Sequence, residues 1–534
     1  MKKTQLILII CFLVNNVYSQ DLTIVNVTTS GTLNTLISSM QETSTTNIKI
    51  TGSIDGRDIF FLRDKMTNLS FIDLSLVNIV AYNGDVFSDY KSNELPNNSF
   101  SNKTKLKKII LPKALTSIGN MAFEYCSELE NIEFPNGLTS IGNYAFLYCS
   151  KMTGDLFFPE TLSTIGQWAF TCCFGINGNI SIPKSLQEIG GSAFLGCGGE
   201  FTVDSNNTQY TSVGGVLFTK NMEVIIKCPL KKINSYSIPT TVKMIGPQAF
   251  AYCKLLTDIS IPNTVLHIWE EAFYLCSGLT SIKIPSSVSY IGSEAFYLCK
   301  SIQGDVIIPN SVISFTPSTF SGCGGSFVVD SNHTKFSTKD GVLFNKDQTE
   351  IYQCPVSKAG SYEIPNYVTT ISVSAFHRCE NLTSITIPSS VSSIIGDSFS
   401  YCTGLVSLIS NRVNPLKIDD PSIFYEVNKS LCTLYVPAGS KNSYENAMPW
   451  SAFSNIVEQT TSTTFAKQDK LVVTIDKNSV IINGGKLGEL AQVFSLSGLK
   501  TDEQTIKNHQ TAFTLRNGVY ILKIGNYSEK IVVR

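Results

Sequence analysis

The chain has 534 residues, of which 43% are hydrophobic and 16% charged, so it carries ample apolar material for a core and lacks the composition of a disordered protein. Its net charge of −1 and the absence of a basic tract argue against nucleic acid and anionic membrane surfaces as partners. Beyond residue 20 no stretch is long and apolar enough to cross a bilayer, so the sequence does not predict a membrane-spanning protein.

Residues 1–20 are typical of a secretory signal peptide. Lys2 and Lys3 supply the positive end, and the apolar run 6–14 is too short to span a membrane, which argues against a retained anchor. Residues 17–19 form an acceptable cleavage site. We therefore expect an exported protein that acts at the cell surface or outside the cell.

Residues 21–93 form an irregular start that we interpret as an N-terminal cap. The pattern predicts a strand at 47–50 and a short amphipathic helix at 31–41, and residues 69–75 show L-x-x-I-x-L spacing. An array of stacked units needs such an atypical first piece, because its open end would otherwise expose the core.

A short unit repeats through residues 94–457, marked by the pair Ala-Phe with a cysteine three residues after the phenylalanine. The step between units is 23 or 24 residues, apart from two steps of 56. Glycine or proline in every unit rules out a continuous helix, so the repeat predicts a stacked β-rich solenoid. The marked phenylalanines are Phe123, Phe146, Phe170, Phe194, Phe250, Phe273, Phe296, Phe320, Phe376 and Phe399.

One unit has the pattern L-x-x-I-x-I-P-x-x-V-x-x-I-G-x-x-A-F-x-x-C, as residues 279–299 show. The alternation at Ile282 and Ile284 predicts a strand with one buried face, which ends at the following proline. Gly292 is expected to permit a corner. Phe296 and the cysteine after it are expected to fill the core, against the units on either side.

The two long steps carry the same insert, so a period of 126 residues lies over the short one. Residues 201–207, F-T-V-D-S-N-N, match residues 327–333, F-V-V-D-S-N-H. A duplication of four units and one insert explains this longer period. The inserts are predicted to be hairpins, formed by 216–218 with 223–227 and by 342–344 with 350–353.

Ten of the fifteen cysteines follow the repeat, so stacking would place them in a column about 5 Å apart. Cysteine packs well as a small apolar residue, and parallel side chains make the disulfide torsion hard to reach. We expect mostly thiols, although column neighbours are close enough to pair. No C-x-x-C pair exists, and residues 203–206, V-D-S-N, lack the spacing of a calcium loop and predict a turn, so no metal site is expected.

After the last marked cysteine the repeat fades. The end of the array is predicted to be closed by a strand at 433–437, a short helix at 439–446 and the aromatic residues of 449–456. Residues 458–466 form a Thr/Ser-rich linker, and residues 467–534 predict a separate small β-sandwich. Its expected strands are 471–475, 480–482, 491–496, 518–524 and 530–534.

The repeat P-x-x-V-x-x-I-G-x-x-A-F-x-x-C closely resembles the BspA-type leucine-rich repeat of bacterial surface proteins. The insert F-x-V-D-S-N-N followed by G-V-L-F, and the closing C-T-L-Y-V-P-A-G-S at residues 432–440, also resemble parts of that family. The resemblance covers about residues 94–457. It implies a β-rich leucine-rich-repeat solenoid with hairpin inserts, and roles in adhesion, host-protein binding and cell aggregation.

The C-terminal piece resembles the sorting domains read by the type IX secretion route of Gram-negative bacteria. The likeness is carried by residues 493–498 (V-F-S-L-S-G), 517–520 (N-G-V-Y) and 530–534, while the P-N-P motif often found at the start of such domains is absent. The resemblance implies that secretion machinery recognises residues 467–534. A plain terminal β-domain of a surface protein is the alternative.

No catalytic constellation is found. The four histidines, His267, His333, His377 and His509, lie in unlike places of the pattern, and the motifs H-E-x-x-H, G-x-S-x-G and G-x-x-x-x-G-K-[ST] are missing. Carboxylates are scattered, and a repeat sets like residues along a line instead of bringing unlike residues to one place. We therefore predict no catalytic residue, no cofactor, no metal ligand and no enzyme activity.

The remaining candidate for function is the outward face of the strands. If Ile282 and Ile284 face the core, Ser281 and Lys283 face outward, and the same positions of other units form a broad, weakly charged sheet. Phe157 stands out there, because aromatic anchors commonly dominate interface energy. The candidate ligand face comprises Asn131, Glu133, Asp155, Phe157, Asn179, Ser181, Asp258, Ser260, Ser281, Lys283, Asp305, Ile307, Ser384 and Thr386.

The sequence as a whole predicts a surface protein that binds host or bacterial surface proteins, such as matrix or serum proteins, by multivalent contact along this face. The alternative without a binding role is that each outward residue is an ordinary solvent-exposed strand residue. A carbohydrate-binding surface component and a passive spacer remain as alternative functions.

Overall fold

The computed structural model describes residues 22–82, 90–459, 472–476, 479–483, 490–506, 510–524 and 527–533. The expected signal peptide, most of the expected linker and His509 lie outside these ranges. The chain packs as two compact units, one of Met1–Leu256 with Ile268–Phe273 and the other of Thr257–His267 with Tyr274–Arg534. The division falls inside β18 (Leu256–Ser260) and β19 (His267–Ile268).

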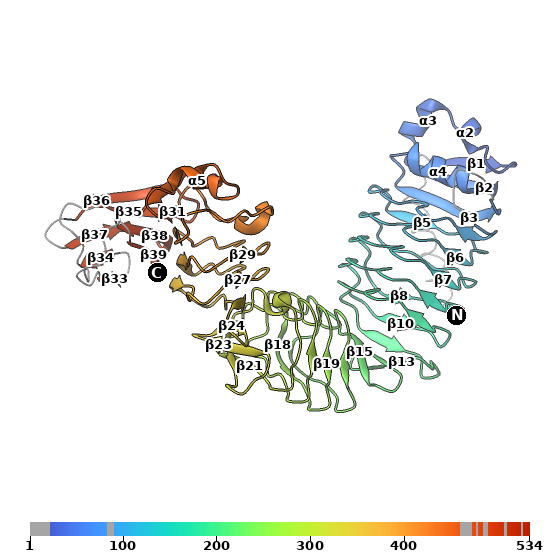
Figure 1. Cartoon of the computed structure of the whole chain (residues 1–534). Coiled ribbons are helices and arrows are strands. Elements are labelled where there is room, and N and C mark those ends of the chain that lie inside the picture. The colour runs from blue at the N-terminus through green and yellow to red at the C-terminus, as the bar shows by residue number, and fades with distance from the viewer. Residues whose placement is uncertain are drawn as a thin grey trace. The chain divides into compact units, whose positions relative to one another are not determined.

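The first unit begins with a parallel sheet in the order β1-β2-β3-β5, against which short helices pack (Figure 1). The strand expected at 47–50 is confirmed as the start of the second strand. The strands are β1 (Leu22–Val27), β2 (Asn47–Ile54), β3 (Phe71–Ile79) and β5 (Lys108–Ile110). The helices are α2 (Leu33–Leu36), α3 (Ser39–Ser44) and α4 (Gly56–Asp64).

The single helix predicted at residues 31–41 is wrong, because α2 and α3 are separated by a break. Ser38 lies in this break and caps α3 by accepting a hydrogen bond from the third helical N–H, which ends any continuous helix there. The sequence prediction also missed α4. Its buried Asp58 accepts hydrogen bonds from the backbone N–H groups of Gly31 at 2.6 Å and Leu33 at 2.9 Å, and so holds the start of α2.

Later turns of the first unit contribute short strands to two further parallel sheets, with orders β8-β10-β12 and β4-β6-β7-β9-β11. The first comprises β8 (Leu156–Phe157), β10 (Ile180–Ile182) and β12 (Phe201–Val203). The second comprises β4 (Glu94–Leu95), β6 (Ser117–Ile118), β7 (Ser140–Ile141), β9 (Thr164–Ile165) and β11 (Glu188–Ile189). The predicted β-rich solenoid is confirmed by this stack of turns.

Both inserts contain the predicted hairpin and one additional strand before it. Within each insert the three strands pair antiparallel to one another. The last of the three also pairs in parallel with a strand of the following turn. In the first insert they are β13 (Tyr210–Val213), β14 (Val216–Thr219) and β15 (Val224–Lys227), followed by β16 (Asn234–Ser237) and β17 (Met244–Ile245). In the second they are β23 (Phe336–Lys339), β24 (Val342–Asn345) and β25 (Glu350–Gln353). The 126-residue period is thus a structural repeat.

The second unit continues with parallel strands and closes with short helices. One sheet has the order β26-β28-β30-β31-β32, and β21 pairs in parallel with β22. The strands are β20 (Tyr290–Ile291), β21 (Asp305–Ile308), β22 (Ser326–Val329), β26 (Gly360–Glu363), β27 (Thr370–Ile371), β28 (Leu382–Ile387), β29 (Ser393–Ile394), β30 (Ser407–Ser410), β31 (Thr433–Val436) and β32 (Asn455–Glu458). The helices are η1 (Pro317–Phe320), η2 (Pro421–Phe424), α5 (Lys441–Glu445) and η3 (Trp450–Ala452).

The marked phenylalanines form columns of stacked rings in the core. In the first unit the ring centroids of Phe123, Phe146 and Phe170 are 5.1 and 5.0 Å apart, with the rings nearly parallel at 8° and 6°. In the second unit the ring of Phe399 lies 5.6 Å from that of Phe424, which extends the column beyond the last marked repeat. Trp450 packs edge-on against Phe424 at 5.4 Å and closes this end of the core, as the sequence suggested.

The segment around each phenylalanine is a series of tight turns whose N–H groups bond to the next turn. Phe123 N donates to Ala145 O at 2.7 Å, and Tyr125 N donates to Leu147 O at 2.8 Å. In the unit at 279–299 the positive φ values, both 55°, belong to Glu294 and Leu298 and not to the glycine that was expected to make the corner. The equivalents of Leu298 in two other turns are Gly196 and Gly322, whose φ values are also positive.

The glycine is required instead by close packing between turns. A Cβ added to Gly142 would lie 2.6 Å from Asn120 N, and one added to Gly166 would lie 2.5 Å from Asn143 N. Both contacts are with backbone atoms that cannot move aside. At these two positions of the repeat the glycine thus makes room for the preceding turn, while the corner role of Gly292 stays a prediction.

The strand predicted at Ile282 and Ile284 is wrong in detail. Both side chains are buried. Ser281, before them, and Lys283, between them, are exposed, so the alternation is as expected. No strand is formed over residues 279–285, although Thr280 N donates to Thr257 O at 3.0 Å. An extended backbone alone produces the alternation, and it does not require a complete ladder of hydrogen bonds.

The described strands after residue 471 form two antiparallel sheets, in the orders β33-β34-β37 and β36-β35-β38-β39. Buried residues of both sheets, such as Ile482 and Val493, belong to one apolar cluster. The sequence missed two of these strands, at 500–505 and 510–514. The strands are β33 (Val472–Asp476), β34 (Ser479–Asn483), β35 (Leu490–Ser495), β36 (Lys500–Thr505), β37 (Gln510–Thr514), β38 (Gly518–Ile524) and β39 (Tyr527–Val533).

The cysteines of the described residues are buried thiols, and several of those in the repeat donate to a backbone carbonyl of a preceding turn. Cys149 Sγ donates to Phe123 O and Cys173 Sγ donates to Phe146 O, each at 3.1 Å. Burial raises the pKa of Cys323 to about 11, and it holds the pKa of Cys149 and Cys173 well above the usual range. The folded chain therefore keeps these thiols protonated where an unfolded chain would ionise them.

This difference predicts a loss of stability in alkali. Below the ordinary thiol pKa of 9.0 both states are protonated, and as pH rises from there towards about 11 the unfolded state is favoured by ionisation of Cys323. The cost is about 1.4 kcal/mol for each thiol per pH unit in this window. Urea unfolding under reducing conditions should show a midpoint that falls between pH 8 and 10, and falls less in a Cys323→Ala variant. An equal fall in both proteins would contradict the assignment.

Candidate ligand-binding face

The outward face of the first unit is centred on β8 and β10. Phe157 is 62% exposed, whereas Leu156 and Phe158 on either side are 4% and 8% exposed and point into the core. This alternation follows from the period of two in an extended chain. Because its two neighbours are buried and fix the backbone, the ring of Phe157 points into solvent.

Four polar residues lie beside Phe157, on or directly before β8, β10 and β12. Phe157 is the register partner of Ser181, and Ser181 is the partner of Thr202 on β12. Asp155 accepts a hydrogen bond from Asn179 N at 2.6 Å, and Thr202 donates to the side-chain oxygen of Asn179. Thr202 was not predicted, because the insert begins there and the repeat pattern stops.

Asn131 and Glu133 extend the face towards the N-terminus. Both are exposed, and Asn131 forms an isolated parallel bridge with Lys108. Beyond them the sheet of the N-terminal cap continues the face, with Asp73 opposite Ile110 in register. The sequence showed the L-x-x-I-x-L spacing of this strand but did not assign its outward residues to the face.

The cap adds a charged pair and an apolar residue to the row. Lys49 lies opposite both Ile24 and Asp73, and its Nζ is 3.0 Å from an Asp73 carboxylate oxygen. Burial opposes ionisation of Asp73, but hydrogen bonds from Ser75 and Lys49 outweigh it and lower the pKa of the carboxyl. Ile24 is 66% exposed, so this end of the row has an apolar side chain beside an ion pair.

In the second unit the predicted residues form an equivalent row. Asp258, Ser260, Ser281 and Lys283 are all exposed, and Ser281 Oγ donates to Asp258 Oδ1 at 3.3 Å. On the neighbouring strands the predicted Asp305 and Ile307 are also exposed. Ile307 lies opposite Val328 in register, and the two are 57% and 38% exposed.

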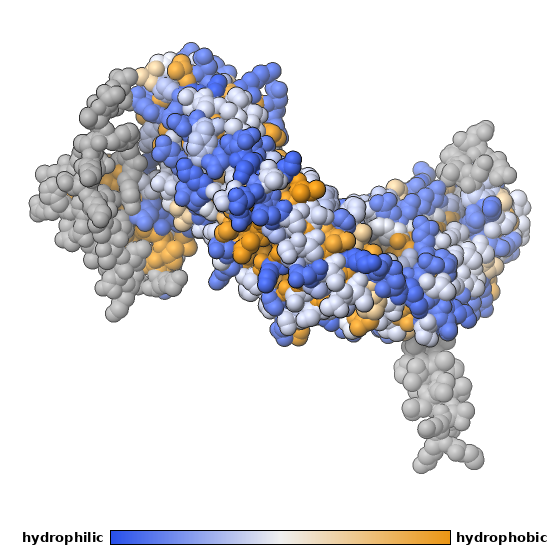
Figure 2. All heavy atoms as spheres, turned by 60° about the horizontal axis from the view of Figure 1, so that its bottom comes forward, coloured by the Kyte–Doolittle hydropathy of each residue, from blue (hydrophilic) through white to orange (hydrophobic). Residues whose placement is uncertain are grey.

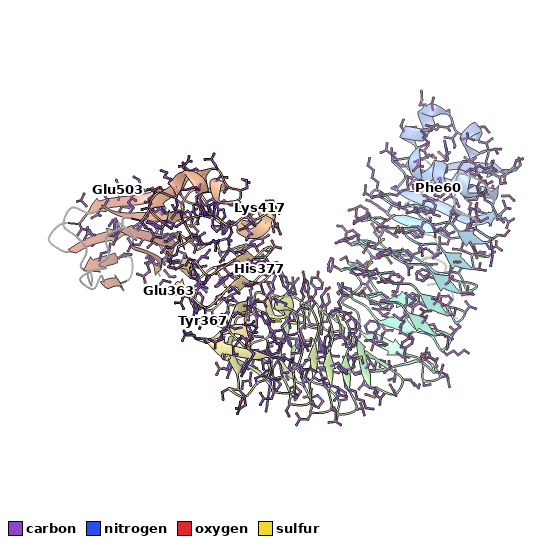
Figure 3. All side chains as sticks on the ribbon, in the orientation of Figure 1. Phe60, Glu363, Tyr367, His377, Lys417 and Glu503 are labelled. Atoms are coloured by element: carbon purple, nitrogen blue, oxygen red, sulfur yellow. The ribbon has the colours of Figure 1, made fainter. Side chains whose placement is uncertain are left out.

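The last predicted residues, Ser384 and Thr386, are half-buried on β28. Glu363, labelled in Figure 3, lies opposite Thr386 on the neighbouring strand. The row continues through three residues that the sequence did not assign to the face, because they follow the last marked repeat. These are Ile409, Tyr435 and Val457, consecutive partners in register.

The face therefore consists of polar rows interrupted by exposed apolar side chains. Figure 2 shows the same character on the side that it presents, where hydrophobic residues reach the surface in separate patches among hydrophilic ones. Such a face offers hydrogen bonds over a wide area and a few apolar anchors. It suits contact with another large molecule better than enclosure of a small one.

The described histidines have structural surroundings. His333 is buried, and its Nδ1 accepts hydrogen bonds from Lys335 N at 3.1 Å and Phe336 N at 3.2 Å. His377 (Figure 3) lies between Ser400 Oγ at 2.7 Å and Tyr297 OH at 3.1 Å, and burial lowers its pKa to about 4. His267 packs against the edge of another ring, and residue 509 is not described.

Two further observations concern sites of other kinds. Within the described ranges, no cluster of three or more His, Cys, Asp or Glu side chains is placed to hold a metal ion. The V-D-S-N segments are turns, as expected, in which Asp204 accepts from Asn206 N and Asp330 from Asn332 N, each at 2.8 Å. None of the helices among the described residues combines the length and apolar character needed to span a membrane.

A family model described as "BspA type Leucine rich repeat region", in six copies, matches residues 85–223, 227–339 and 350–471. Among solved structures, the pneumococcal vaccine antigen PcpA is 20% identical over 77% of this chain and 79% of its own, with a TM-score of 0.39. A leucine-rich repeat protein of Eubacterium ventriosum is 21% identical over 69% of this chain and 81% of its own, with a TM-score of 0.40.

A third structure, a leucine-rich repeat protein of Bacteroides ovatus, is 21% identical over 73% of this chain and 92% of its own, with a TM-score of 0.32. No curated protein sequence matches the chain.

The alternation at β8 makes adjacent phenylalanines respond differently to the same change. Phe157→Ser should alter the free energy of unfolding by no more than about 0.5 kcal/mol, because the ring is exposed. Phe158→Ser should lower it by about 3–5 kcal/mol, because that ring stacks on Phe134 at 5.5 Å and meets Phe170 edge-on at 5.7 Å. Urea unfolding of the two variants measures the difference, and similar losses would show that the face is assigned to the wrong side.

Proposed function

Because the chain belongs to the BspA-type leucine-rich repeat family, we propose that it is an exported, non-enzymatic surface protein that binds other proteins through the outward strand rows of its solenoid. The observation that carries the proposal is the exposure of Phe157 on an otherwise polar sheet. A large aromatic side chain in water is costly to the free protein and becomes favourable when a partner covers it. The Ile307 and Val328 pair offers a second anchor of this kind.

The proposed mechanism is multivalent. Each anchor with its surrounding hydroxyl and amide groups contributes modest affinity, and several such groups along one chain add up when the partner is long or repetitive. The weak net charge of the chain does not favour one strongly charged partner. Host or bacterial surface proteins, such as matrix or serum proteins, are the partners that we propose.

The C-terminal residues 467–534 are proposed to form a small β-sandwich that secretion machinery of the type IX kind recognises. Two antiparallel sheets that share buried residues support the first part. The motifs at 493–498 and 517–520 support the second. Val493 of the first motif is buried, so this segment also contributes to the core, and the second motif is followed on β38 by the buried Leu522.

Adhesion through the strand rows predicts that exposed apolar anchors control binding. In pull-downs from a panel of matrix and serum proteins, the secreted chain carrying Phe157→Ser with Ile307→Ser should bind its partner with an affinity lower by about thirtyfold for each substitution, because hot-spot residues contribute about 2 kcal/mol each. Ile313→Ser is the matched control, since Ile313 is 60% exposed but lies outside the rows.

Retention that is the same in all three proteins would contradict the strand-face assignment. Binding to a glycan array that survives the double substitution would favour a carbohydrate-binding component. A chain that retains no panel member and no glycan would indicate a passive spacer.

The sorting proposal predicts that deletion of residues 467–534 leaves the protein in the periplasm. The remaining solenoid should stay folded, because its described core closes at Trp450 and Phe453 before the deletion begins. Surface proteolysis of intact cells followed by immunoblotting measures display. Unchanged display of the shortened chain would refute a sorting role for this piece.

A further inference from the structure

The first insert is flanked by exposed apolar residues that belong neither to the strand rows nor to the core. Ile233, Leu255 and Phe174 are 57%, 56% and 46% exposed. Asn234 N, directly after Ile233, donates to Leu255 O at 3.1 Å, and Phe174 meets the ring of Tyr252 edge-on at 6.4 Å. We call Phe174, Ile233 and Leu255 the insert patch.

The duplicated copy of the insert shows that the fold does not require these side chains. The positions 126 residues later carry Lys300, Ala359 and Asn381 in place of Phe174, Ile233 and Leu255. The strands around both inserts have the same order and register. The first copy of the insert region therefore has large apolar side chains at these three positions, and the second copy does not.

The polar version makes an additional hydrogen bond. Asn381 Nδ2 donates to Val356 O at 3.0 Å. Leu255 has no donor with which to make such a bond, and more than half of its surface is exposed to water. In the free protein the leucine is thus the less favourable residue at this position, which points to a partner that covers it.

Phe174 has a structural role besides its exposure. Its Cε1 atom lies 2.9 Å from the place where a Cβ on Gly196 would be, so the ring lies across that glycine to reach Tyr252. In the second copy a residue from a different position of the repeat contacts the equivalent glycine, because Leu298 Cδ2 lies 2.5 Å from the Cβ position of Gly322. Ile233 and Leu255 are therefore the residues that test the patch without disturbing this contact.

Three lysines surround the patch. Lys231 Nζ donates to Asn177 O, and Lys232 Nζ donates to Gly214 O at 2.9 Å while it lies 5.3 Å from the ring centre of Tyr236. Lys254 directly precedes Leu255 and is exposed. Over the described residues, none of the three is ion-paired with a carboxylate of the chain.

In the second copy the corresponding position to Lys254 is Glu380, which pairs with Arg378 at 3.5 Å. Among the described residues, the insert patch therefore has three lysines without an ion-pair partner near its apolar side chains. A ligand that complements both features has carboxylates beside an apolar side chain.

We propose that the insert patch binds an acidic segment of a partner protein, whose apolar side chain packs on Ile233 and Leu255 while its carboxylates meet Lys231, Lys232 and Lys254. This surface is separate from the strand rows, so it does not depend on the adhesive function proposed for them. It adds a charge-selective contact to a chain whose overall charge is close to zero.

The test uses three fluorescein-labelled peptides of equal length, which alternate glutamate with leucine, glutamate with serine, or lysine with leucine. Fluorescence anisotropy with the full mature chain should show binding of the glutamate–leucine peptide, weakened by salt because the contact is partly ionic. The glutamate–serine peptide should bind at least about tenfold more weakly, since it lacks the apolar contact. The lysine–leucine peptide should not bind.

The substitutions are taken from the second copy, where the fold accepts them. Ile233→Ala with Leu255→Asn should lower the affinity for the glutamate–leucine peptide by about tenfold or more, and Lys254→Glu should lower it by a similar factor. Conversely, Ala359→Ile with Glu380→Lys and Asn381→Leu should increase binding by creating a second apolar centre beside Lys358 with positive charge at position 380. Phe157→Ser with Ile307→Ser should leave peptide binding unchanged, which separates this site from the strand rows.

Equal binding of the three peptides, or an unchanged affinity in the Ile233→Ala, Leu255→Asn chain, would overturn the proposal. Circular dichroism melts of each variant establish that the chain is folded. The gain expected from Ala359→Ile with Glu380→Lys and Asn381→Leu provides a readout that loss of folding cannot mimic.

Discussion

Phenylalanine rings of neighbouring marked turns stack on one another, at centroid distances of 5.0 and 5.1 Å among Phe123, Phe146 and Phe170. The rest of the solenoid depends on this contact. Rings can stack so closely only if successive backbones are held at the same spacing, which is the spacing of paired strands. The hydrogen bonds from Phe123 N to Ala145 O and from Cys149 Sγ to Phe123 O maintain that spacing on both sides of the ring.

The same constraint explains which predictions from sequence were successful. Residues that must fill identical space in every turn recur at fixed intervals, so the phenylalanines, the cysteines and the inward aliphatic residues could be identified from the pattern alone. Features that depend on a contact with the neighbouring turn could not. From the sequence, Gly142 is expected to be a flexible corner. Only the position of Asn120 N shows that a glycine is needed there because a Cβ would collide with the preceding turn.

The candidate face was predictable to the extent that it follows from the core. Once Leu156 and Phe158 are known to face inward, Phe157 must face outward, and the structure shows it exposed. Thr202, Tyr435 and the cap residue Lys49 were missed for one reason. They lie where the sheet continues but the repeat motif does not, so no spacing in the sequence marked them. Their assignment needed the register of β12, β31 and β2 with their neighbours.

The duplication shows how binding specificity can arise on such a scaffold. Stacking fixes the inward positions in both copies, so selection for function can act only on the positions that stacking leaves open. Leu255 and Asn381 occupy one of those positions, and the asparagine is the better residue for a chain alone in water because it satisfies a carbonyl oxygen. A leucine retained there beside unpaired lysines has no explanation in the stability of the first unit. Its explanation must lie in what the surface contacts, which is why differences between the two copies are more informative about function than the features they share.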